Sequence, residues 1–185
     1  LQQIPRQELI FLERVLVVGG AAGESNFTEL ITNSSPELDP APTRKDDAAF
    51  WLYSSGSTGP PKACIHLQHD MVVSTEHYAK AILKITENDR FFSVAKLFFA
   101  YGLGNGLYFP LSVGATSILL PGPPRPQSVF GVIARYRPTL FFSVPSNYVK
   151  LLAHPAEQRE FDLSSIRHAI SAGEALPPSV FHRFK

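Results

Sequence analysis

The chain has 185 residues, of which 44% are hydrophobic and 18% charged, so it is an ordinary globular sequence rather than a collagen-like, coiled-coil or fully disordered one. Its 17 Lys and Arg residues nearly balance 16 Asp and Glu residues, and a net charge of +1 gives no reason to expect nucleic acid or an anionic membrane as the main partner. The longest apolar stretches are far shorter than the roughly 20 residues of a membrane-spanning helix. The single cysteine, Cys64, cannot form an internal disulfide. We therefore expect a soluble domain, or part of one, in a reducing, cytoplasmic compartment.

Strand-like and helix-like patterns follow one another along the chain. Apolar runs rich in β-branched and aromatic residues are typical of strands, whereas apolar residues spaced three and four apart are typical of one helix face. The expected strands are residues 15–18, 49–53, 63–66, 90–94, 116–120, 139–143 and 166–170. The expected helices are residues 26–32, residues 70–88 with Asp70 as the cap, residues 129–136, and a last helix that includes Phe184 and Lys185.

The order of these elements predicts the fold class. Residues 34–47 hold three prolines and almost no apolar side chain, which indicates an extended surface connection rather than a domain linker. The repeated strand–helix units predict an α/β fold with a mainly parallel sheet flanked by helices. The chain starts at Leu1 and ends at Lys185 inside an expected helix, and its only methionine is Met71, so we expect a piece of a longer protein.

The loop from Tyr53 to Lys62, YSSGSTGPPK, carries the groups that a polyphosphate site needs. Gly56 and Gly59 allow the backbone to approach a ligand closely, and successive N–H groups can form an anion-binding nest. Lys62 adds a mobile positive charge. Hydroxyl donors come from Ser54, Ser55, Ser57 and Thr58. Each hydrogen bond to a charged phosphate oxygen is worth about 1.5–3 kcal/mol, so several together can hold a triphosphate.

Three other interpretations of the glycine-rich segments are less favoured: a plain turn, a Walker A loop and a dinucleotide-binding fingerprint. A serine-rich turn between two strands is the alternative for residues 53–62, and the Thr-Gly-Pro-Pro-Lys ending favours phosphate binding over it. Two prolines separate Gly59 from Lys62, which excludes a Walker A loop. The glycines within residues 19–23 and 102–106 miss the spacing of a dinucleotide-binding fingerprint and are expected in turns or packing positions.

Residues 53–62 resemble the phosphate-binding signature of the adenylate-forming superfamily, which includes acyl- and aryl-CoA ligases, adenylation domains of peptide synthetases, and luciferases. Two further segments agree with this family in order and spacing: residues 97–111, LFFAYGLGNGLYFPL, and residues 171–177, SAGEALP. Within the superfamily these forms are most similar to benzoate-CoA and hydroxybenzoate-CoA ligases. The resemblance spans essentially the whole chain, although Ala63 stands where the family usually has glycine after the loop lysine.

The resemblance implies an enzyme, an AMP-forming acid–thiol ligase. Attack of a carboxylate on the ATP α-phosphate would give an acyl-adenylate and pyrophosphate, and the CoA sulfur would then displace AMP to form a thioester. The implied partners are an aromatic carboxylate of the benzoate type, ATP with Mg²⁺, and CoA as a substrate, with no nucleic acid. Self-association into a homo-oligomer is left open.

The resemblance also implies roles for individual residues. Thr58 and Lys62 are the expected catalytic residues, because they would stabilise charge on the leaving pyrophosphate. The expected ATP-binding residues are Ser54, Ser55, Gly56, Ser57, Thr58, Gly59, Lys62, Gly173, Glu174 and Ala175. The expected acyl pocket consists of Phe99 as an aromatic gate, Ala100, Tyr101 and Ala172. No metal ligand is expected in this chain.

Residues 1–185 are therefore expected to be the middle part of a large N-terminal adenylation domain, with its upstream part and a C-terminal domain absent. The family's magnesium-binding threonine–glutamate pair, ribose-binding aspartate, hinge and catalytic lysine would follow Lys185, so the isolated piece is expected to be inactive. The alternative is a nucleotide-binding adenylation module for another carboxylic acid or for a carrier-protein acceptor. A purely structural α/β domain is disfavoured because residues 53–62, 97–111 and 171–177 resemble three family motifs in the family's order.

The segment after the loop offers one competing site. His66 and His69, with Asp70 as a neighbouring carboxylate, are a weak zinc pattern because the sequence places no third ligand with the two histidines. The favoured role for His66 is that of a hydrogen-bonded core histidine. Cys64 is expected to be buried in its short strand.

Overall fold

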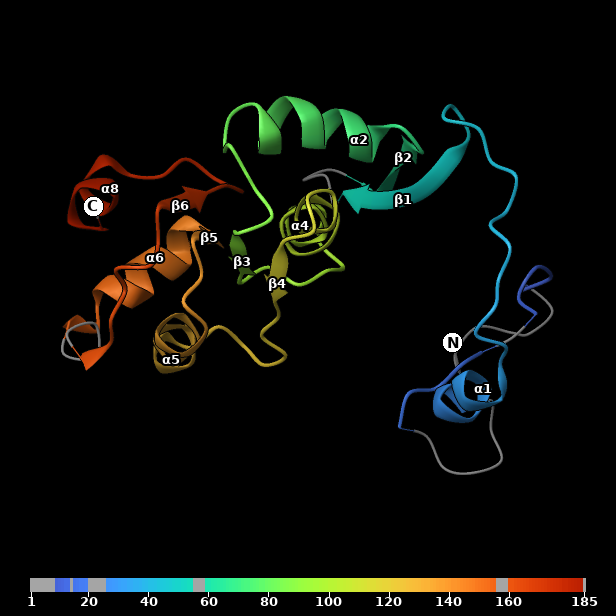
Figure 1. Cartoon of the computed structure of the whole chain (residues 1–185), viewed down its shortest axis with the longest axis horizontal. Coiled ribbons are helices and arrows are strands. Elements are labelled where there is room, and N and C mark those ends of the chain that lie inside the picture. The colour runs from blue at the N-terminus through green and yellow to red at the C-terminus, as the bar shows by residue number, and fades with distance from the viewer. Residues whose placement is uncertain (1–8, 14, 20–25, 55–58, 156–159, 185) are drawn as a thin grey trace. The chain divides into compact units, whose positions relative to one another are not determined.

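The computed structural model describes residues 9–13, 15–19, 26–54, 59–155 and 160–184 (Figure 1). The chain divides into two compact units, Leu1–Pro42 and Thr43–Lys185. The elements that position the candidate site all belong to the second unit.

The first unit contains one helix, α1 (Phe27–Asn33), among its described residues. Asn26 caps it by accepting a hydrogen bond from the Thr28 N–H at 2.9 Å, as expected for an N-cap asparagine. The strand predicted at residues 15–18 is wrong: the segment forms only an isolated parallel bridge between Val17 and Asn26, because no described strand of this unit pairs with it. Residues 34–47 are exposed and contain no helix or strand, which confirms an extended surface connection. The boundary between the two compact units falls inside this segment, after Pro42, so the expectation that it does not link separate units is wrong.

An antiparallel hairpin opens the second unit. Strands β1 (Ala48–Ser54) and β2 (Lys62–Leu67) place Trp51 opposite Ile65 and Ser54 opposite Lys62. The pair forms a sheet of its own, separate from the parallel sheet. The expected burial of Cys64 is wrong: this residue is exposed, because a two-stranded sheet has no neighbouring layer over much of its surface.

The helical segment that follows ends earlier than the sequence predicts. Helix α2 (Asp70–Ser74) continues as the π-helix η2 (Thr75–Lys80), and Lys84 adopts a left-handed conformation with φ of 54°. Leu83 and Ile85 are both buried. Residues two apart cannot share one face of a helix, so burying both requires the chain to leave the helix before them. Asp70 is the first helical residue rather than the cap.

The predicted parallel sheet is confirmed. Its order is β4 (Thr116–Ile118), β3 (Arg90–Ser93), β5 (Leu140–Ser143), β6 (His168–Ser171), and every neighbouring pair is parallel. The intervening helical elements are α3 (Ala100–Leu103), η3 (Gly104–Tyr108), α4 (Phe109–Leu111), α5 (Pro126–Tyr136) and α6 (Pro145–Leu152), and α8 (Pro178–Phe184) follows β6.

Each face of this sheet has its own hydrophobic core. On one face, Phe92 and Phe141 pack with side chains from α5, α6 and α8. On the other, Phe91 and Phe142 pack with side chains from η2 and α4, so helices cover both faces (Figure 1). The four phenylalanines are fully buried. Burial of each side chain contributes about 1.5–3 kcal/mol, which makes β3 and β5 the most strongly held strands.

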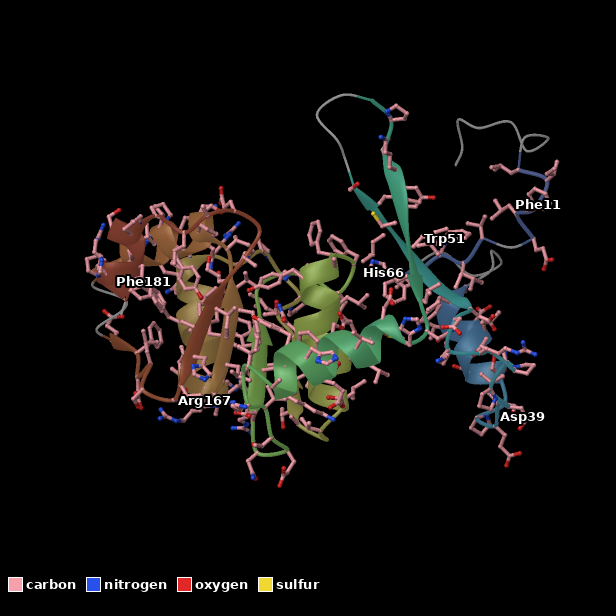
Figure 2. The ribbon with its side chains drawn as sticks, turned by 90° about the horizontal axis from the view of Figure 1, so that it is seen from above. Phe11, Asp39, Trp51, His66, Arg167 and Phe181 are labelled. Atoms are coloured by element: carbon pink, nitrogen blue, oxygen red, sulfur yellow. The ribbon has the colours of Figure 1, made fainter. Side chains whose placement is uncertain are left out.

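An ion pair between the buried Asp89 and the partly exposed Arg167 closes the amino edge of the sheet. Arg167, just before β6, donates from Nε and Nη2 to the two carboxylate oxygens of Asp89 at 2.9 and 2.8 Å (Figure 2). The Thr139 hydroxyl also donates to Asp89. The same guanidinium reaches the carbonyl oxygens of Leu83 and Lys84. This network therefore joins the starts of three parallel strands to the segment that leaves η2.

The Asp89 network predicts a pH-dependent part of stability. Desolvation by burial raises the pKa of Asp89, but hydrogen bonds from Arg167, Thr139 and the Thr86 N–H outweigh it and lower the pKa from 3.8 to about 2. A carboxyl group with a depressed folded pKa stabilises the fold above its unfolded pKa and loses that contribution as pH falls through the folded value. We expect about 2 kcal/mol to be lost between about pH 4 and pH 2, measured by hydrogen exchange of the β3 and β5 amides.

The matched variants for this test are Asp89→Asn and Asp39→Asn. Asp89→Asn should be less stable at neutral pH and should lack this part of the pH dependence. Asp39 is exposed in the first unit, so Asp39→Asn should behave as the wild type. An equal loss of stability on acidification in Asp89→Asn and wild type would contradict the assignment.

Candidate active site at the carboxyl edge of the parallel sheet

The carboxyl ends of four parallel strands lie at one edge of the sheet. In open parallel sheets this edge is where ligands bind. Residues 94–99 follow β3, residues 119–125 follow β4, Val144 and Pro145 follow β5, and residues 172–175 follow β6. Two of the three segments singled out in the sequence therefore begin at this edge.

Unsatisfied polar groups gather at the same edge. Ser93 ends β3, Ser171 ends β6, and Asn147 lies in the first turns of α6 just after β5. A side-chain oxygen of each is buried and has no hydrogen-bond partner among the described residues. A buried polar atom without a partner costs about 1–3 kcal/mol, so this edge is less optimised for stability than the amino edge.

The segment that follows β3 presents aromatic side chains. Phe99 occupies the N-cap position of α3 and is 56% exposed. The centroid of its ring is 4.5 Å from that of the Phe98 ring. Ala100 is exposed, and Tyr101 is half-buried with its ring edge on Phe142. Phe99 and Ala100 are thus accessible, whereas the Tyr101 ring is held against Phe142. Such an arrangement suits the mouth and wall of a pocket.

Two tyrosine hydroxyls donate to a backbone carbonyl near the carboxyl end of β6. Tyr101 donates to the Ile170 carbonyl oxygen at 3.3 Å, and Tyr148, on α6, donates to the same oxygen at 2.9 Å. Desolvation by burial raises the pKa of both hydroxyls, so both remain protonated donors. The expected acyl wall at Tyr101 is thus tied to the strand that ends one residue before Ala172. Sequence reasoning missed Tyr148, whose only signal was its place three residues after Pro145.

Residues 172–175 leave the end of β6. The Ala172 N–H donates to the Ser143 carbonyl oxygen at 3.3 Å, which extends the pairing with β5 by one bond. Gly173 has φ of +93° and lies beside the Val144 side chain. Glu174 and Ala175 are exposed. The residues assigned to ATP binding in this segment therefore lie at the same edge as Tyr101.

The hairpin holds both ends of the predicted phosphate loop. Ser54 ends β1 and Lys62 begins β2, and the two residues are register partners. Gly59 has φ of +133°, and both Gly59 and Lys62 are exposed. Ser55, Gly56, Ser57 and Thr58 lie outside the described residues. The antiparallel pairing brings the loop ends together.

A histidine–aspartate pair lies where the hairpin meets α2 (Figure 2). His66 Nδ1 is 3.1 Å from Asp70 Oδ2, and the His66 ring stacks on Phe50 with centroids 4.9 Å apart. The hydrogen bond from the Leu67 N–H is the main cause that lowers the pKa of Asp70. This pair lines a cavity of about 290 Å³ that Ala100 also borders. The partner of His66 is therefore a carboxylate, and no group of three possible metal-ligating His, Cys, Asp or Glu side chains occurs in the described part of the chain.

The parallel sheet with helices on both faces defines an α/β domain of the open-sheet type. The sequence profile of the AMP-binding enzyme family matches residues 6–185, and the chain belongs to this family.

Individual relatives agree with the family assignment. Benzoate–CoA ligase of Thauera aromatica is 50% identical over 170 residues, which make up 92% of this chain and 32% of that protein. A crystal structure of a benzoate CoA ligase from Burkholderia xenovorans LB400 has 44% identity and a TM-score of 0.82, covering 97% of this chain and 35% of that one. The anthranilate CoA ligase AuaEII in complex with anthranoyl-AMP has 36% identity and a TM-score of 0.89, covering 97% of this chain and 34% of that one. The chain thus spans about a third of the length of these relatives. None of its described helices has the length and apolar character needed to cross a membrane.

The shared carbonyl at Ile170 predicts unequal effects of two tyrosine substitutions. Tyr148→Phe removes the shorter hydrogen bond and should lower the local free energy of unfolding of β6 by about 1 kcal/mol. Tyr101→Phe removes the longer bond and should cost less. Hydrogen exchange of the β6 amides measures both effects, and a larger cost for Tyr101→Phe would contradict the hydrogen-bond geometry.

Proposed function

We propose that the whole protein activates benzoate or a close aromatic acid and transfers it to CoA. A carboxylate oxygen attacks the ATP α-phosphorus and pyrophosphate leaves, which gives an aroyl-adenylate. The CoA thiol sulfur then attacks the aroyl carbon, the thiol proton is lost and AMP leaves, which gives the thioester. The observation that supports this proposal is that Tyr101, in the segment after β3, donates to Ile170 near the carboxyl end of β6, in a chain 50% identical to a benzoate–CoA ligase.

The proposal assigns the phosphate end of the site to the hairpin loop. Thr58 and Lys62 stabilise charge on the leaving pyrophosphate, with the remaining donors of residues 54–59 around them. Residues 173–175 contact the adenine from the end of β6. Mg²⁺ accompanies ATP and neutralises phosphate charge when bound. Protein ligands for this ion lie outside the groups described above.

The proposal assigns the acid end to the segment after β3. Phe99 closes the mouth, and Ala100 with Tyr101 and Ala172 lines the space for the ring. The Tyr101 hydroxyl donates to Ile170, so the side chain offers a fixed ring surface to the acid. This chain would then be the middle of a larger N-terminal domain in a cytoplasmic enzyme, and inactive by itself. Self-association stays a prediction.

Anthranilate is the second candidate acid. The observation that favours it is the TM-score of 0.89 to an anthranilate CoA ligase whose structure contains anthranoyl-AMP. Benzoate remains first because identity is higher to the two benzoate relatives, at 50% and 44%. Pyrophosphate release by the whole protein with benzoate, hydroxybenzoates, anthranilate and acetate separates these candidates.

The phosphate assignment predicts large losses in two variants. Lys62→Ala and Thr58→Ala should each lower kcat/KM for ATP about 10- to 100-fold, because each removes a hydrogen bond to a charged phosphate oxygen. Pyrophosphate release with saturating benzoate measures the effect. Lys150→Ala, at an exposed position on α6, is the control and should match wild type. Unchanged pyrophosphate release in Lys62→Ala and Thr58→Ala would contradict the assignment of residues 54–62 to phosphate binding.

The acid assignment predicts a selective effect at Ala100. Ala100→Leu fills space meant for the aromatic ring and should raise KM for benzoate at least about 10-fold, while KM for ATP changes less than about twofold. Steady-state pyrophosphate release under varied benzoate and varied ATP measures the two constants. An equal rise in both constants, or no rise in either, would place Ala100 outside the acid pocket.

A further inference from the structure

We propose that Lys96 is a positioning residue for the acid pocket. Its ammonium group fixes the segment that carries Phe99, Ala100 and Tyr101 to the chain that leaves β4. The inference rests on the proposed function, which assigns those three residues to the acid.

The Lys96 side chain bridges two connections at the carboxyl edge. It is half-buried, and its Nζ donates to the carbonyl oxygen of Leu120 and, at 2.6 Å, to that of Gly122. Leu120 and Gly122 follow β4, whereas Lys96 follows β3. These bonds therefore join the two connections beyond the last backbone hydrogen bonds of the sheet.

The Lys96 backbone holds the start of the aromatic segment. Its carbonyl oxygen accepts a hydrogen bond from the Phe99 N–H at 3.0 Å, which closes a turn just before α3. At Gly102 an added Cβ would collide with the same Lys96 oxygen and would lie 2.6 Å from the Ala95 oxygen. The first turn of α3 therefore rests directly on the Lys96 peptide.

These contacts transmit the position of Lys96 to the pocket residues. With the ammonium fixed, the turn from Lys96 to Phe99 and the close approach at Gly102 leave little freedom for the residues between them. Phe99 and Tyr101 then keep their orientation although Phe98 and Phe99 are largely exposed. The acceptors are backbone carbonyls, and no carboxylate lies within salt-bridge distance of Lys96 among the described residues, so the ammonium serves the loop geometry rather than an ion pair.

The test uses the full-length protein and three variants at this position. Lys96→Met removes the donors at similar length, Lys96→Gln keeps N–H donors without charge, and Lys96→Arg keeps both. Lys150→Met, at an exposed position on α6, is the matched control.

The expected kinetic result is selective for the acid. Lys96→Met should raise KM for benzoate about 10-fold in pyrophosphate release, because two charge-assisted hydrogen bonds are lost, and should leave KM for ATP within about twofold. Lys96→Gln should fall between Lys96→Met and wild type. Lys96→Arg should restore KM to within about threefold of wild type. A wild-type benzoate KM in Lys96→Met, or an equal rise in KM for ATP, would overturn the proposal.

A second readout needs no substrate. Chymotrypsin cleavage after Phe98 or Phe99, mapped by mass spectrometry, should be faster in Lys96→Met and unchanged in Lys96→Arg and Lys150→Met. Wild-type resistance to cleavage in Lys96→Met overturns the proposal. If Lys96→Met does not fold, the same two readouts on Lys96→Gln decide, and wild-type values there overturn it.

The two readouts separate this inference from the proposed function. Absence of benzoate-dependent pyrophosphate release in the wild type would reject the function. Chymotrypsin cleavage of the free protein would then still test whether Lys96 holds the segment.

Discussion

The pairing of β3 with β5 is the constraint on which the rest of the second unit depends. Four fully buried phenylalanine rings pack across this pair, with centroids 5.9 Å apart on one face and 5.5 Å apart on the other. Because successive strand residues point to opposite faces, a slip of one residue would exchange the two cores. The register is therefore strongly specified, and it determines which residues leave the sheet at its carboxyl edge.

Polar side chains perform different tasks at the two edges of this sheet. At the amino edge, Arg167 and Asp89 bond to each other and to further partners such as Thr139, so that edge contributes stability. At the carboxyl edge, Tyr148 donates to a backbone carbonyl of β6 and Lys96 to one of the connection after β4, while the Ser171 hydroxyl has no partner among the described residues. Stability is thus concentrated away from the edge that the proposed function assigns to ligands.

The sequence predicts what is local or periodic, and it misses what depends on distant partners. Strands at 90–94 and 139–143 are recognisable as apolar runs between turn signals, and the parallel sheet follows from their alternation with helices. The Asp89–Arg167 pair joins residues 78 positions apart, and no local pattern indicates it. For the same reason the helix expected to reach residue 88 ends at Lys80: tertiary burial of Leu83 and Ile85 overrides local periodicity. The site segments were found by motif, whereas the side chains that hold them were not.

The hydrogen bonds of Tyr101 and Lys96 affect how the proposed pocket would select its acid. The Tyr101 hydroxyl and the Lys96 ammonium are both engaged with backbone carbonyls, so neither is free to act mainly as a donor to a ring substituent. In the proposed pocket, what would remain toward the acid is an aromatic surface with a small residue, Ala100, beside it. Discrimination would then rest on shape, and a pocket of this kind distinguishes one methyl-sized group by only about 1–3 kcal/mol. Such selectivity demands that the wall not move, which is the condition that the bonds of Lys96 and Tyr148 supply.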